Sequence, residues 1–110
     1  MKPKKMGWIY LIIAGIFEIG WPLSLKLSEG MENKAFGIVL AAISMGLSCF
    51  FLYIAQQTIS IGTAYAVWTG IGAVGTLIVG ILFFGDSTSF WRLFSAFLIV
   101  VGIIGLKLSH

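Results

Sequence analysis

One acidic residue of this sequence, Glu18, lies inside a long apolar run, whereas Glu29, Glu32 and Asp86 lie in short polar segments. A run as long as this one would place Glu18 near the centre of a bilayer. A charged group there costs at least about 2.5–3.5 kcal/mol, so such a residue usually marks an ion pathway or a proton relay. The alternative is a protonated glutamic acid that hydrogen-bonds a neighbouring helix. We favour the functional interpretation.

No lysine or arginine inside an apolar run is placed to pair with Glu18. Lys26 follows two helical turns later and Lys107 is at the other end of the chain, both near the edge of a run, where a lysine can reach the membrane surface. An apolar environment favours the protonated form of a carboxyl group, and a bound cation favours the ionised form. A proton and a cation would therefore compete for Glu18, which is the minimal chemistry of an antiporter.

Aromatic residues accompany this carboxylate. Trp21 shares a helical face with Glu18, because it lies three residues later, and Tyr65 and Trp68 have the same spacing in another apolar run. A desolvated cation gains about 2 kcal/mol from an aromatic face, so these residues could form a cation-binding box. The alternative is an aromatic belt at the membrane surface. The belt fits a second, more peripheral set better: Trp8, Tyr10, Phe90 and Trp91.

The composition places these residues in a membrane. Of the 110 residues 59% are hydrophobic and 10% are charged, and the mean hydropathy is +1.05, whereas a soluble domain has about 25% charged residues. A soluble enzyme, a nucleic-acid-binding module and a disulfide-rich secreted protein are excluded, the last because Cys49 is the single cysteine. The sequence contains no nucleophile–base set, metal-ligand cluster or phosphate-binding loop. We therefore expect neither catalysis nor a cofactor.

Four apolar runs are long enough to cross a bilayer, which takes about 20 residues per helix. They cover residues 7–27, 35–55, 61–85 and 90–108. The connections are short and polar, so successive helices must be antiparallel. We expect one all-α, four-helix transmembrane domain over residues 1–110. Asp86 or Ser87 is expected to cap the fourth helix.

Small residues mark two of these runs. Gly70 and Gly72 could bend the third helix, or they could simply allow close packing, and the sequence does not decide between the two. In the fourth run, Ser95 and Gly102 are seven residues apart, which is about two helical turns. They form a smooth stripe against which another helix could pack.

The distribution of positive charge is nearly balanced across the membrane. One side carries Lys2, Lys4, Lys5 and Lys107, and the other carries Lys26, Lys34 and Arg92. The side with more lysine and arginine usually faces the cytoplasm. Here the two sides differ by one charge, and this difference is too small to fix the orientation. Insertion in both orientations would allow an antiparallel dimer in which two Glu18 residues meet near the midplane. The alternative is a parallel dimer with a cytoplasmic N-terminus.

Two segments, AGIFEIGW at residues 14–21 and GTAYAVWTGIG at residues 62–72, strongly resemble the small multidrug resistance family. The resemblance covers essentially the whole chain, and Trp21 is similar to the guanidinium exporter branch. It implies an antiparallel homodimer with dual topology in the inner membrane of a bacterium. It also implies proton-coupled, alternating-access exchange, with Glu18 as the shared proton and substrate site and Trp21, Tyr65 and Trp68 lining it.

The same resemblance implies roles for further residues. Ser48 would hydrogen-bond the carboxylate, and Gly15 would lie near the site. Gly70 and Gly72 would form the bend of the third helix, and Ser95 and Gly102 would form the dimer contact.

The sequence departs from the guanidinium branch at Pro22, where close relatives usually carry a small helix-forming residue. A proline inside a helix removes one backbone hydrogen bond and can kink the helix.

The sequence leaves several functions open. The leading hypothesis is an exporter of guanidinium or substituted guanidinium ions, because a planar guanidinium makes paired hydrogen bonds to a carboxylate. The first alternative is an exporter of quaternary ammonium or other lipophilic cations, which would rely on aromatic faces. The chain could also be one subunit of a heterodimeric pair. A proton-translocating rotor subunit is disfavoured by the four spans and by the position of Glu18 in the first of them.

Overall fold

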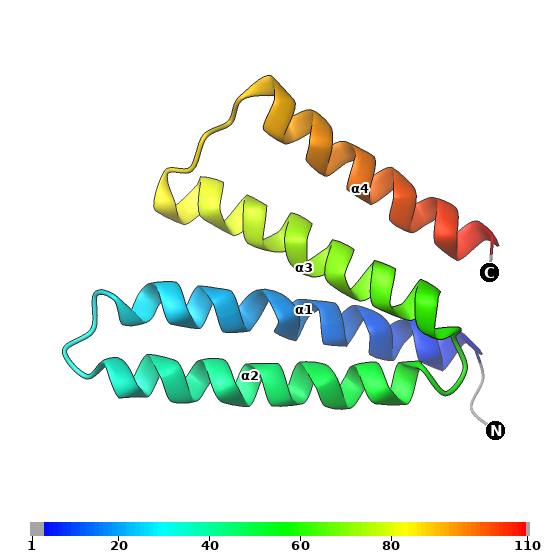
Figure 1. The fold of residues 1–110 in the computed structure, drawn as a ribbon, viewed down its shortest axis with the longest axis horizontal. Helices are drawn as coiled ribbons and strands as arrows, with labels where there is room; N and C mark the ends of the chain where they lie inside the picture. Colours follow the sequence, from blue (N-terminus) through cyan, green and yellow to red (C-terminus); the bar gives the residue numbers. More distant parts are fainter. Residues whose placement is uncertain (1–3, 110) are drawn as a thin grey trace.

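The computed structural model describes residues 4–109, and these form four antiparallel helices (Figure 1). They are α1 (Lys4–Ser28), α2 (Lys34–Ala55), α3 (Ile61–Phe84) and α4 (Phe90–Ser109). Each is long and apolar enough to cross a membrane. The all-α, four-helix transmembrane fold expected from the hydropathy pattern is confirmed.

The helix ends follow from local chemistry. Asn33 caps α2, since its side chain accepts a hydrogen bond from the Ala35 N–H at 3.1 Å. Gly85 ends α3 in the left-handed conformation, with φ of 69°, which glycine adopts without steric cost. The prediction that Asp86 or Ser87 caps α4 is wrong. Ser89 does so instead, accepting from the Arg92 N–H at 3.4 Å, because it directly precedes the helix.

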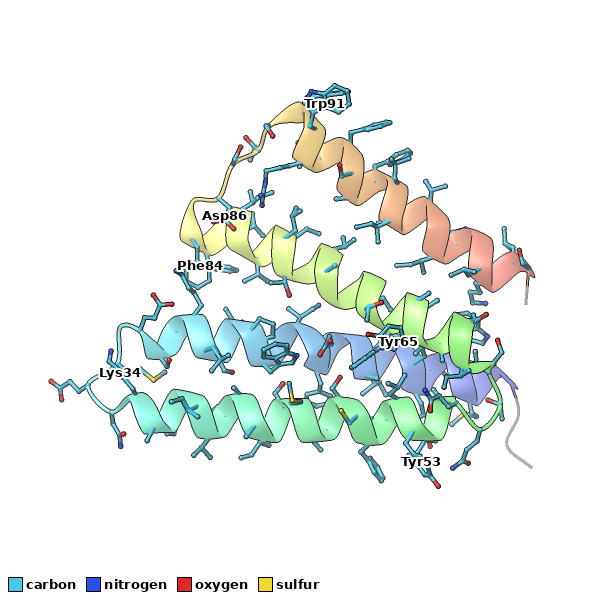
Figure 2. The ribbon with its side chains drawn as sticks, viewed as in Figure 1. Lys34, Tyr53, Tyr65, Phe84, Asp86 and Trp91 are labelled. Atoms are coloured by element: carbon cyan, nitrogen blue, oxygen red, sulfur yellow. The ribbon has the colours of Figure 1, made fainter. Side chains whose placement is uncertain are left out.

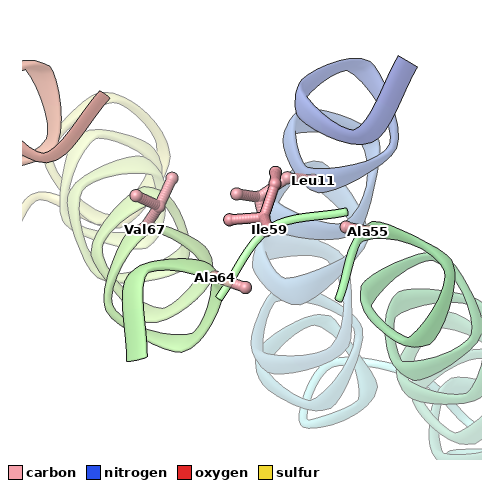
Figure 3. Close-up of a cluster of buried hydrophobic side chains, with 5 residues drawn as sticks. All are labelled: Leu11, Ala55, Ile59, Ala64 and Val67. Atoms are coloured by element: carbon pink, nitrogen blue, oxygen red, sulfur yellow. The ribbon is translucent and has the colours of Figure 1, made fainter. Parts of the chain in front are cut away.

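Helix α1 lies between α2 and α3, and α4 packs beside α3 (Figure 1). A small core joins the first three helices near the connection between α2 and α3. It consists of Leu11, Ala55, Ile59, Ala64 and Val67, all at most 1% exposed (Figure 3). Only this end of the bundle has such a cluster, among the described residues. Helix α1, which carries Glu18, therefore extends from this core towards its connection with α2.

Helix α4 is the least packed element. None of its described residues is buried, and it diverges from the other helices towards the connection from α3 (Figure 1). Its other end is held by Ile103 and Leu106, which contact the core, and by Lys107, whose Nζ lies 5.2 Å from the centre of the Trp8 ring. In this region a groove is lined by residues of α1, α3 and the start of α4.

Candidate functional site

Glu18 and Trp21 form the centre of the candidate site on α1. Both are partly buried, and the Trp21 indole N–H donates a hydrogen bond to Glu18 Oε1. The spacing of three residues brings the two side chains to one helical face, as the sequence predicted. This bond occupies one carboxylate oxygen and fixes its orientation. Glu18 forms no ion pair with any side chain that the structure describes.

Glycines allow α1 and α3 to approach closely beside this carboxylate. Gly72 is buried, and a Cβ atom there would overlap Glu18 Cγ. A Cβ at Gly15 would lie 2.6 Å from Ile71 Cγ2 of α3, whereas one at Gly70 would face α4, 2.9 Å from Ile103 Cδ1. Helix α3 is continuous through Gly70 and Gly72. These contacts support close packing, and a functional bend there stays a prediction.

Glu18 opens into a groove of about 440 Å³ between α1, α3 and the start of α4. Trp21 and Pro22 line it from α1, and Gly72 and Thr76 are among the residues that line it from α3. Two charged residues complete the lining, Asp86 and Arg92. Neither residue was expected at the site, because the sequence predicted a capping role for Asp86 and Arg92 entered only the balance of positive charge. No sequence pattern indicates that the turn after α3 reaches the groove of Glu18.

Ser48 lies close to this site with partners that differ from the expected one. It is fully buried, its hydroxyl donates to the Ala14 carbonyl at 2.7 Å, and it accepts a bond from Trp68 Nε1 at 2.8 Å. The resemblance implied a bond from this serine to the carboxylate. A hydroxyl has one proton, and here that proton is directed to Ala14, one turn before Glu18.

The second aromatic pair, Tyr65 and Trp68, lies outside the groove that contains Glu18. The Tyr65 and Trp68 rings have centroids 5.6 Å apart, and Tyr65 is 56% exposed. Neither lines the groove of Glu18 within the single chain. Figure 2 shows Tyr65 towards the start of α3, whereas Asp86 lies beside Phe84 at its other end. Of the predicted aromatic box, the single chain therefore places Trp21 at the carboxylate, whereas Tyr65 is exposed and Trp68 is partly buried against the core.

The small residues of α4 are exposed. The Ser95 hydroxyl donates to the Trp91 carbonyl in its own helix at 2.7 Å, and nothing lies within 4 Å of a Cβ placed on Gly102. Both positions leave room for a neighbouring helix. Large apolar side chains surround them, including Phe97, Leu98, Val101 and Ile104, each at least 48% exposed.

Known proteins are similar to this chain over nearly its whole length. The family model for Small Multidrug Resistance protein matches residues 6–99. A guanidinium exporter of Yersinia pseudotuberculosis is 49% identical over 104 residues, which cover 94% of this chain and 99% of that protein. Guanidinium exporters of Citrobacter freundii and Salmonella typhimurium are each 52% identical over 104 residues, covering 94% of this chain and 98% of theirs.

Proposed function

The chain belongs to the small multidrug resistance family of multi-pass bacterial inner-membrane exporters of small cations, and from this we propose that it exchanges guanidinium or substituted guanidinium ions for protons. Members of this family are transporters and not enzymes. Relatives that are named guanidinium exporters align over nearly their full length. The substrate, the coupling and the residues below are our proposal.

The observation that carries the proposal is the Glu18 carboxylate in its groove. One oxygen accepts the Trp21 N–H, and no described side chain neutralises the charge. A guanidinium ion presents pairs of parallel N–H donors, which match the two oxygens of a carboxylate. The groove of about 440 Å³ leaves room for a small planar cation beside Trp21.

Exchange follows from competition for this one group. A proton on Glu18 removes the charge that holds the cation, and a bound cation favours release of the proton. If the two ligands are bound in turn and each complex changes the side to which it opens, cation export is coupled to proton entry. Neither Lys26 nor Lys107 pairs with Glu18, since Lys26 lies 3.5 Å from Glu29 and Lys107 lies over Trp8.

We propose that two copies in opposite orientations make the working unit. Helix α4 has no buried residue, and its stripe of Ser95 and Gly102 is open to a second helix. Opposed copies would supply the inverted symmetry on which alternating access depends in larger transporters. Tyr65 is exposed and Trp68 is partly buried beside it. On this proposal the second copy would approach them, and there they would complete the walls around the cation.

The test is transport by the purified protein in liposomes with a proton gradient. We expect guanidinium to move against protons and the exchange to be lost in Glu18→Gln. Tetraalkylammonium ions test the alternative substrate class, because they have no N–H donors and depend on aromatic faces. Exchange of tetraalkylammonium without exchange of guanidinium would overturn the substrate assignment. Guanidinium movement without proton movement would overturn the coupling.

A further inference from the structure

A second carboxylate, Asp86, lies at one end of the groove that contains Glu18. Asp86 and Arg92 both line this groove, and Asp86 also lines an adjoining cavity of about 310 Å³ together with Pro22 and Lys26. Figure 2 shows Asp86 beside Phe84, where α3 ends, at the end of the molecule that also carries Lys34. Asp86 therefore lies where the groove reaches the surface, and Glu18 lies deeper along α1.

The backbone holds Asp86 in this place. Gly85 turns the chain back in the left-handed conformation, and the Asp86 N–H donates to the Gly80 carbonyl at 3.1 Å. The Asp86 carboxylate lies against α3 at Gly80, where a Cβ atom would overlap Oδ2. The carboxylate is thus positioned by the turn and by the missing side chain at Gly80. It does not cap α4, since Ser89 has that role.

Arg92 is close to Asp86 but is held loosely. Arg92 Nη2 and Asp86 Oδ2 are 3.9 Å apart, which is beyond hydrogen-bond distance. The Arg92 side chain is 40% exposed and that of Asp86 is 49% exposed, and an ion pair this exposed contributes little to stability. Arg92 Nε is buried and has no hydrogen-bond partner among the described residues. A small cation with better geometry could therefore replace Arg92 at Asp86 at low cost.

The group that Arg92 presents to Asp86 is itself a guanidinium. Resting on the proposed function, we propose that Asp86 is an outer binding site for the transported guanidinium ion, which displaces Arg92 there before it moves along the groove to Glu18. A free guanidinium ion can approach the carboxylate with two parallel N–H groups, which the tethered Arg92 does not do in this structure. A negative charge at the mouth of a groove also raises the local concentration of cations.

The neighbouring charges make Asp86 available for this role. Lys26 reaches the adjoining cavity but lies 3.5 Å from Glu29 Oε1. Arg92 is thus the only described cation in ion-pair range of Asp86. Removing the charge of Asp86 should lower the affinity for guanidinium, and removing Arg92, its competitor, should raise it. If the two residues formed a purely structural ion pair, both substitutions would instead lower the transport rate alike.

The experiment measures guanidinium–proton exchange by full-length protein in liposomes over a range of guanidinium concentrations. For Asp86→Asn we expect KM to rise by about three- to fivefold, as for the loss of an exposed charge pair, with an unchanged maximal rate. For Arg92→Gln we expect KM to fall by a similar factor. Asp86→Glu should restore the wild-type KM. Glu32→Gln is the matched control, since it removes an exposed carboxylate from the connection at the same end that lines neither cavity and forms no ion pair with a described side chain.

Three results would overturn the outer site. One is a KM for Asp86→Asn that equals that of Glu32→Gln. Another is a parallel loss of maximal rate in Asp86→Asn and Arg92→Gln, which would indicate a structural pair. The third is an absence of guanidinium exchange by the wild-type protein, and it is distinguishable because it removes the proposed function as well. The first two leave Glu18-dependent exchange by the wild type intact.

Discussion

Trp68 Nε1 lies 2.8 Å from Ser48 Oγ, and the Ser48 hydroxyl donates in turn to the Ala14 carbonyl at 2.7 Å. This chain of hydrogen bonds joins α3 to α1 through α2. It meets α1 one turn before Glu18. A buried hydroxyl of α2 therefore links the Trp68 indole of α3 to the α1 backbone near the carboxylate.

Ser48→Ala tests this link. The substitution leaves the Trp68 N–H without its acceptor and Ala14 without its extra donor, and an unsatisfied buried group costs about 1–3 kcal/mol. We expect a lower melting temperature in detergent and weaker guanidinium binding. Ser44→Ala is the control, because Ser44 donates to the Phe17 carbonyl at 2.8 Å but bonds to no aromatic side chain. Equal guanidinium affinity in both variants would contradict a role for Ser48 at the site.

Glu18→Gln tests the shared proton and cation site. Glutamine keeps the size of the side chain and can still accept the Trp21 N–H, but it does not ionise. We expect the variant to insert and fold, and to lose guanidinium binding and coupled exchange. In the wild type, binding should weaken as the pH falls, because protons then occupy the group that holds the cation. Coupled exchange by Glu18→Gln, or binding that is independent of pH, would remove Glu18 from this role.

Gly72→Ala tests the close contact between α3 and the carboxylate. A methyl group at position 72 would overlap Glu18 Cγ, so the Glu18 side chain or the two helices must shift. Overpacking of this kind typically costs about 1–3 kcal/mol. We expect guanidinium affinity to fall, measured by the quenching of tryptophan fluorescence. Gly62→Ala in the same helix is the control, since nothing lies within 4 Å of a Cβ there. Similar affinities in the two variants would contradict the contact.

Hydropathy and local spacing predicted the parts of this molecule that depend on neighbouring residues. The four helices follow from four long apolar runs, and the Glu18–Trp21 bond follows from a spacing of three residues in one helix. The contact of Gly72 with Glu18 depends on how α1 and α3 pack, and the sequence showed only that both lie in helices.

Other features depend on competition between partners or on the angle of a helix. Ser48 donates to the Ala14 carbonyl and not to the Glu18 carboxylate, and the sequence alone does not rank these two acceptors on α1. The meeting of Asp86 and Arg92 in the groove depends on the divergence of α4 from α3, which leaves no mark on the periodicity of either helix. The capping prediction failed because Ser89, and not an earlier polar residue, directly precedes Phe90.

Pro22→Ala tests whether the departure from the guanidinium branch affects substrate choice. Proline has no N–H, so the Glu18 carbonyl, four residues earlier, lacks its usual helical donor. Pro22 lines the groove together with Glu18. We expect alanine to restore the backbone bond and to change the relative rates for guanidinium, alkyl-guanidinium and tetraalkylammonium ions more than it changes the melting temperature. Unchanged relative rates would make Pro22 a structural variation only.

The orientation of the chain in the membrane can be tested by labelling single cysteines. Both described ends and the 56–60 connection lie at one end of the bundle, and the two other connections lie at the opposite end (Figure 1). Lys2 and the side chains of Lys4 and Lys5 lie outside the described part. Because they precede α1 or begin it, the charge count places them on the side of the 56–60 connection. Cys49 is exposed and must be replaced by serine first. Glu32 is a suitable labelling position in the connection from α1 to α2, because it is exposed and its replacement leaves Asn33, the cap of α2, intact.

In the Cys49→Ser background, Glu32→Cys reports the end with the connection from α1 to α2, and Gln57→Cys reports the opposite end; both residues are exposed. The lysine and arginine bias is one charge, so we expect each cysteine to react with an impermeant maleimide from both faces of the membrane. Labelling of Glu32→Cys from one face and of Gln57→Cys only from the other would contradict dual topology. Such a result would require a parallel arrangement, and the inverted pairing of two Glu18 residues would then have no structural basis.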